Sequence, residues 1–119
     1  MSHAAYARTA QASSSPREIE AQTLLMAARK LVEVQSNWNG ADKRMQAALL
    51  FNRRLWTIFM GEAENNDNPQ PLEVRQNILN LAVFVMQRTL DIQVDPKPEK
   101  LQSLIDINSN IAAGLSGRP

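Results

Sequence analysis

The sequence predicts an all-α protein, a small bundle of four main helices with short polar connections and a flexible N-terminal arm. Apolar residues recur at three- and four-residue spacing in four segments, which is the period of an amphipathic helix. Proline, glycine and asparagine separate these segments. No segment shows the strict alternation that is typical of a half-buried strand. With 119 residues, the chain has room for one domain.

The segment over residues 1–14 is rich in alanine and serine, which predicts a flexible arm or a short helix. The helical domain is expected over residues 15–115, with a tail at 116–119. The first helix begins at Ser15-Pro16-Arg17-Glu18 and ends near Ser36. Serine caps a free amide, proline suits the first helical position, and glutamate completes a capping box.

The residues Asn37-Trp38-Asn39-Gly40 end this helix, because Asn and Gly tolerate the left-handed backbone of a helix end. Trp38 is expected to fold back onto the core. A second helix spans about residues 42–61, and Asp42 is placed to cap it. An acidic loop over residues 62–71 follows.

A third helix is predicted over about residues 72–93, where Pro71 opens the helix and the centre is apolar on most sides. Asp95-Pro96-Lys97-Pro98 stops it and starts the last helix, which ends at Gly114 to Gly117. The second and third helices have narrow polar stripes. They are therefore predicted to form the middle of the bundle.

Two asparagines fall on apolar faces, Asn52 in the second helix and Asn108 in the last. A buried amide without a partner costs about 1–3 kcal/mol, so both need hydrogen bonds. The favoured interpretation is structural: they bond to each other or to helix-end carbonyls and fix the helix register. The alternative is that one of them binds the backbone of a partner.

Four apolar residues stray onto polar faces, and we predict that they form a surface for a partner helix. Isolated exposed apolar residues are also common, which is the alternative. Phe84 is the strongest candidate, because amides and an arginine frame it, as at many contact hot spots. The four are Phe84, Leu50, Ile19 and Met26.

Arg53 and Arg54, with Lys43 and Arg44 before them, make the most basic segment. Their charges spread over about 100° of the helix surface without an aromatic stacking platform, which argues against nucleic-acid binding. A solvated stripe paired with nearby acids is favoured, and the acids between residues 62 and 73 are candidates for this pairing. Arg53 and Arg54 remain candidates for orienting a bound partner.

Composition argues against an enzyme. The chain has no cysteine, and its one histidine is His3. Thiolate chemistry, metal-ligand spacing and a nucleophile beside a base are therefore missing, and we expect no cofactor and no metal. A net charge of +1 provides no general attraction for nucleic acid or anionic membranes. No apolar run has the length of a signal peptide or a membrane span, which predicts a cytoplasmic protein without membrane insertion.

Four phrases occur in an order that resembles the FlaF family of flagellar biosynthesis regulators, from Ser15 to Leu115. They are SPREIE, FNRRLWTIFMGE, QPLEVRQNILNLAVFV and LIDINSNIAAGL. The segment before Ser15 is where the chain departs most from this likeness.

The resemblance implies a small cytoplasmic protein, not an enzyme, that promotes flagellin synthesis or secretion. It implies flagellin as the partner, bound as by an export chaperone, with an FlbT-type regulator acting beside it. The alternative is a post-transcriptional regulator that acts on flagellin mRNA directly or through FlbT.

Overall fold

The computed structural model describes residues 15–117. The predicted arm over residues 1–14 and the last two residues of the predicted tail lie outside the described residues. The described chain contains four α-helices and one short 3-10 turn, and no strand. The predicted all-α fold of four main helices is confirmed. The elements are α2 (Pro16–Ser36), α3 (Lys43–Glu64), α4 (Leu72–Val94), η1 (Pro98–Lys100) and α5 (Leu101–Leu115).

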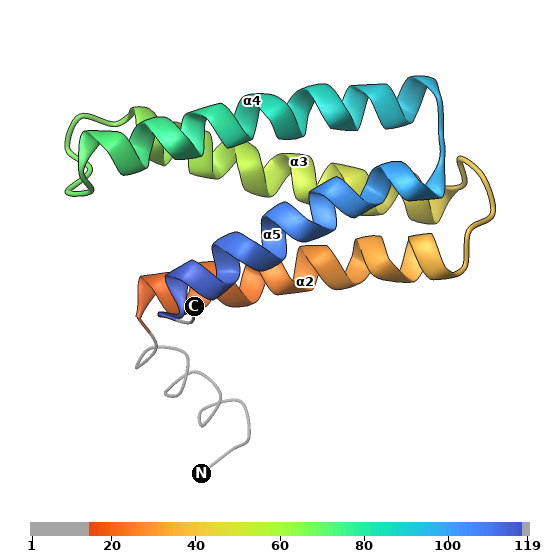
Figure 1. Ribbon diagram of the computed structural model, residues 1–119, viewed down its shortest axis with the longest axis horizontal. Helices are drawn as coiled ribbons and strands as arrows, with labels where there is room; N and C mark the ends of the chain where they lie inside the picture. The colour runs from red at the N-terminus through yellow and green to blue at the C-terminus, as the bar shows by residue number, and fades with distance from the viewer. Residues whose placement is uncertain (1–14, 118–119) are drawn as a thin grey trace, which may run out of the picture.

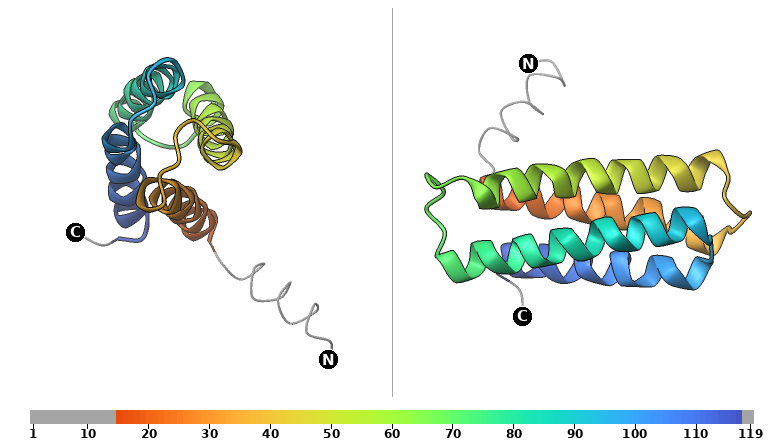
Figure 2. Two further views of the ribbon diagram at one scale, coloured as in Figure 1. Left: turned by 90° about the vertical axis from the view of Figure 1, so that its right-hand side faces the viewer. Right: turned by 90° about the horizontal axis from the view of Figure 1, so that it is seen from above.

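The helices form two pairs, with α2 packed along α5 and α3 packed along α4 (Figure 1). Contact between α2 and α3 joins the pairs, whereas α4 and α5 touch over a much smaller area. Seen end-on, the helices occupy the corners of a four-sided bundle, so that α3 lies diagonally opposite α5 (Figure 2). Each helix runs antiparallel to its neighbour in sequence, as short connections require.

The starts of α2 and α3 follow the capping signals of the sequence. Ser15 Oγ accepts a hydrogen bond of 3.1 Å from the amide of Glu18 at the start of α2. Asp42 Oδ1 accepts one of 3.0 Å from the amide of Met45 at the start of α3. In the turn between them Gly40 has φ of 66°, the left-handed conformation that glycine adopts without strain. The half-buried Trp38 packs against the core, as predicted.

Two arginines satisfy carbonyls at helix ends. Arg44 Nη2 donates to Asn37 O over 2.7 Å at the end of α2, and Arg75 Nε donates to Ala63 O over 2.8 Å at the end of α3. Both place a cation where the helix dipole is negative. The predicted end of the second helix at residue 61 was too early, because the buried Ala63 and its arginine cap hold a further turn.

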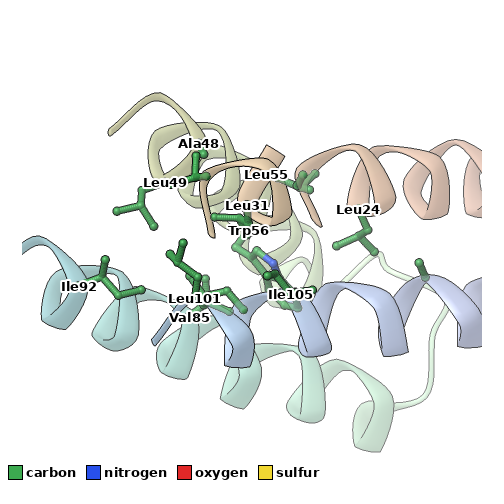
Figure 3. Close-up of a cluster of buried hydrophobic side chains, with 14 of the residues drawn as sticks. Leu24, Leu31, Ala48, Leu49, Leu55, Trp56, Val85, Ile92, Leu101 and Ile105 are labelled. Carbon is green, nitrogen blue, oxygen red and sulfur yellow. The ribbon is translucent and has the colours of Figure 1, made fainter. Parts of the chain in front are cut away.

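The core lies between the four helices and is built from leucine, isoleucine, valine, methionine and small residues around Trp56 (Figure 3). Trp56 is fully buried and meets the ring of Phe59 edge-on, with 5.4 Å between the centroids. In Figure 3, side chains from α2, α3, α4 and α5 point into this common space.

The prediction that residues 72–93 form a central helix was wrong. In α4 only four residues are buried, and several large apolar side chains remain exposed. The reason is its limited packing: α4 packs along α3 and touches α5 little. Its all-round apolar composition therefore leaves an apolar outer surface. The four buried residues are Ala82, Val85, Thr89 and Ile92.

A chain of side-chain hydrogen bonds crosses the core from α3 to α5. Trp56 Nε1 donates to Asn108 Oδ1 over 2.9 Å, and Asn108 Nδ2 donates to Asn52 Oδ1 over 2.6 Å. All three side chains are fully buried. Asn52 Nδ2 ends the chain without a hydrogen-bond partner. The geometry makes Asn108 the central member, because it serves both of its neighbours.

A cluster of charges joins the end of α4 to the start of α5. Lys100 Nζ lies 3.1 Å from Asp91 Oδ1 and 3.2 Å from Asp95 Oδ2. The hydrogen bond from Lys100 is the main cause that lowers the pKa of each aspartate below its ordinary value. Nearby, Arg88 Nε donates to Ser103 Oγ over 3.0 Å. These polar contacts fasten two helices that share little apolar surface.

Replacing Asn108 by Leu is expected to destabilise the protein more than replacing Asn52 by Leu. Asn108→Leu leaves Trp56 Nε1 and the Asn52 amide without partners. Asn52→Leu unpairs Asn108 Nδ2 but also removes an amide nitrogen that already lacks an acceptor. Since each newly unpaired buried group costs about 1–3 kcal/mol, Asn108→Leu should lower the free energy of unfolding by at least about 2 kcal/mol.

Urea unfolding followed by circular dichroism measures both variants, with the double variant closing the thermodynamic cycle. Equal losses for the two single variants, or a larger loss for Asn52→Leu, would contradict the proposed role of Asn108.

The cluster at Lys100 predicts an acid-dependent contribution to stability. Because the folded-state pKa values of Asp91 and Asp95 are lowered, their contribution is present above the ordinary aspartate pKa and is lost as the pH falls through the lowered values. Lys100→Met should therefore destabilise the protein at about pH 7 and have little effect at about pH 2. Urea unfolding of both proteins at each pH checks this, and a pH-independent difference would exclude the charge interaction as its cause.

Candidate partner-binding groove

A groove runs along the surface between α2 and α3, with a volume of about 770 Å³. We refer to its apolar lining residues as the floor and to its charged lining residues, which come from both helices, as the rims. The part of α3 that lines it extends from Arg44 to Ile58, which corresponds to roughly 21 Å at 1.5 Å per residue. The apolar lining consists of Val34, Ala47, Ala48, Leu50, Phe51, Leu55 and Ile58.

The groove exists because α3 has a second apolar stripe beside the stripe that enters the core. Ala47, Phe51 and Ile58 follow one another at helical spacing, and none of them belongs to the buried set. Ala47 and Ala48 are small, which keeps the floor low between the two helices. Ile58 is 58% exposed, so its side chain is accessible from the groove.

Basic side chains dominate the rims. Lys30 of α2 lies with its Nζ 5.1 Å from the centroid of the Phe51 ring, a cation–π contact at the surface. Arg54 of α3 also lines the groove. Neither has an ion pair within residues 15–117. Arg44 is held by Asp42 at 3.3 Å, and Glu33 is the single acidic lining residue.

The six residues predicted to bind a partner do not form one surface. Leu50, 37% exposed, and Arg54 line the groove. Ile19 and Met26 do not line it, but they share a face of α2 with its lining residue Thr23, because they lie four positions before and three positions after it. Met26 is exposed and Ile19 is half-buried.

The other two predicted residues lie apart from the groove. Arg53 is exposed but is not among its lining residues. Phe84 belongs to α4, is 39% exposed, and has the guanidinium carbon of Arg88 5.7 Å from its ring centroid. It is one of several exposed apolar residues on that helix, which are Leu72, Val74, Val83, Phe84, Leu90 and Val94.

Comparison with known proteins identifies the family. A family model described as flagellar protein FlaF matches residues 2–115. The chain belongs to the FlaF family. No curated protein and no solved structure shows significant similarity to it. The family match begins at residue 2, so it extends beyond the stretch from Ser15 to Leu115 in which the four phrases occur.

In this FlaF-family domain, fewer residues of the basic segment form ion pairs with acidic residues than predicted. Arg44 forms an ion pair with Asp42, but the structure shows none for Lys43, Arg53 or Arg54 within residues 15–117. The predicted pairing with acids between residues 62 and 73 was therefore wrong. In the acidic loop, Asn68 Nδ2 donates to the backbone carbonyl of Glu62 over 2.8 Å, a bond that does not involve a carboxylate.

A second pocket, of about 460 Å³, lies at the end of the bundle where α2 begins and α3 ends. Its apolar lining includes Phe59, Ile78 and Ile111, and its charges are mixed. Burial, with the nearby Glu62 carboxylate, raises the pKa of Glu20, and Arg17 opposes this shift. Both acids line this pocket.

The side chains that line the groove are suited to non-covalent binding. An apolar floor with cationic rims fits an amphipathic helix. Within residues 15–117, no group of three histidine, cysteine or acidic side chains is arranged to hold a metal ion. None of the described helices combines the length and the apolarity that crossing a bilayer requires.

Sequence reasoning missed Lys30, Phe51 and Ile58 of the groove. The signal was present in α3, where Ala47, Phe51 and Ile58 form an apolar stripe displaced from the core stripe. Because the helix was judged apolar on most sides, both stripes were assigned to the interior. The contribution of Lys30 depends on how α2 packs against α3, which no local pattern specifies.

Glu20→Gln is expected to stabilise the protein at neutral pH. The folded-state pKa of Glu20 is raised, so the charged carboxylate is disfavoured by folding, and this penalty grows as the pH rises above the ordinary glutamate pKa. The gain should vanish at about pH 3, where the group is protonated in both states. Urea unfolding at both pH values measures it.

Glu18→Gln serves as the matched control. Its carboxylate lies in the first turn of α2, where negative charge favours the helix dipole, so its removal should not stabilise the protein. Equal effects of the two substitutions would contradict a specific penalty at Glu20.

Proposed function

We propose that this protein promotes flagellin synthesis or secretion by binding flagellin in the cytoplasm as an export chaperone. Membership of the FlaF family supports a role in flagellum biosynthesis. The observation that carries the proposal is the open groove between α2 and α3, in whose apolar lining Leu50 and Ile58 remain exposed in the folded domain. An FlbT-type regulator is a further proposed partner, and no catalytic step is part of this role.

The physical reason for a chaperone concerns the unassembled substrate. The ends of flagellin form amphipathic helices in the assembled filament, and before export their apolar faces have no partner. A groove of roughly four helical turns is long enough to cover such a face. Burial of apolar surface supplies the affinity in helix-in-groove recognition, and the charged rims set the orientation.

Binding of purified flagellin should depend on the groove. Ile58→Ser is expected to weaken binding about tenfold, because it removes a large exposed apolar side chain from the site. Leu90→Ser is the control, since Leu90 on α4 has a similar exposure, 62% against 58% for Ile58, but lies outside the groove. Titration calorimetry gives both affinities, and equal affinities would exclude the groove as the site.

Phe84→Ala tests whether the surface of α4 also contributes to the binding of flagellin.

Salt separates this proposal from direct binding of flagellin mRNA. Phosphate contacts should weaken steeply between roughly 50 and 200 mM salt, whereas binding in an apolar groove should change much less. Protease protection of flagellin in the complex would then map the bound segment. Tight, salt-sensitive binding to the mRNA without binding to flagellin would favour the post-transcriptional alternative.

A further inference from the structure

We infer that the groove between α2 and α3 selects an amphipathic helix of about four turns that carries acidic residues on both flanks of its apolar stripe. The inference rests on the proposed function where flagellin is the probe, and it names the chemistry that the bound helix must have. The observations that carry it are the length of the groove and the charges of its two rims.

The charges lie on opposite rims. Lys30 belongs to α2 and Arg54 to α3, and the two helices form the two walls. The contact between Lys30 and Phe51 places the lysine level with the middle of the groove, and Arg54 lies one turn further along α3 than Phe51. A helix bound in the groove therefore meets one basic residue from each wall.

These charges are available to a partner. Lys30 and Arg54 form no ion pair within residues 15–117, whereas Arg44 is held between Asp42 and the end of α2. Glu33 is the one acidic residue of the lining, against three basic ones. Acidic side chains on the bound helix would gain two charge pairs beside a surface that excludes water.

The outer surface of α4 offers no comparable argument. Its exposed apolar residues have basic neighbours that are already engaged within the domain. Arg75 donates to the carbonyl of Ala63, and Arg88 contacts Asp91 and Ser103. Nothing there favours one class of occupant over another, whereas the rims of the groove require negative charge.

Two synthetic peptides, each long enough for about four helical turns, test the inference on the whole chain. Both form the same amphipathic helix, with glutamates on both flanks in one and lysines in the other. Fluorescence anisotropy at roughly 50 mM salt should show tighter binding of the acidic peptide. Each of Lys30→Glu and Arg54→Glu should weaken that binding about three- to tenfold.

The double variant Lys30→Glu/Arg54→Glu should prefer the lysine peptide, and this reversal cannot result from misfolding. Arg29→Glu is the matched control, because Arg29 is exposed, precedes Lys30 and does not line the groove. Equal binding of the two peptides, no binding of either, or the same loss for Arg29→Glu would overturn the inference. The inference would also be overturned if the wild-type protein self-associates and the double variant does not. It would be overturned as well if the wild-type protein binds oligouridylate and the double variant does not.

The binding of flagellin is measured separately from the binding of the peptides. If flagellin binds the wild-type protein and the double variant equally, the inference fails while the proposed function stands. If the double variant reverses the preference between the two peptides as expected but flagellin does not bind, the proposed function fails. The selectivity of the groove for an acidic helix then still stands.

Discussion

The arrangement of the bundle depends on the hydrogen-bonded chain from Trp56 through Asn108 to Asn52. It joins α3 to α5, which lie on a diagonal and belong to different helix pairs. Close packing of the apolar core already penalises displacement of a helix, and buried amides add to this because they have few satisfactory geometries. The chain therefore helps to fix the relative position of the two pairs. The groove follows from that position, because its walls are one helix from each pair.

The same sequence property has different consequences in α3 and α4. Both helices are apolar around most of their circumference, and both were expected at the centre. In α3 the excess apolar stripe faces α2 across a groove, so that it is concave and flanked by charge. In α4 the excess lies outside this groove, and the nearby arginines are engaged within the domain. Position in the groove and available charge, rather than hydrophobicity, distinguish the better candidate site.

The sequence was sufficient for the number, order and approximate ends of the helices, because caps and helix breakers act over short distances along the chain. Ser15, Asp42 and Gly40 have the contacts or backbone that their residue types predict. Burial of Asn52 and Asn108 also followed from helical spacing. The position of α4 did not, because it depends on how helices pair. For the same reason the six predicted partner-binding residues divide between separate surfaces, and the sequence did not indicate Lys30 as a residue of the groove.

The apolar floor and the charged rims of the groove are expected to have different roles in binding, for a physical reason. Its floor consists of aliphatic and aromatic side chains without directional preferences, so that it accepts many apolar stripes with similar free energy. Discrimination must then arise at the rims, where a like charge on the wrong helix is repelled and an acidic flank is attracted. Because Lys30 and Arg54 belong to different helices, their separation is fixed by the packing of α2 against α3. A feature of the core, the register between helix pairs, thereby determines which helices the surface can distinguish.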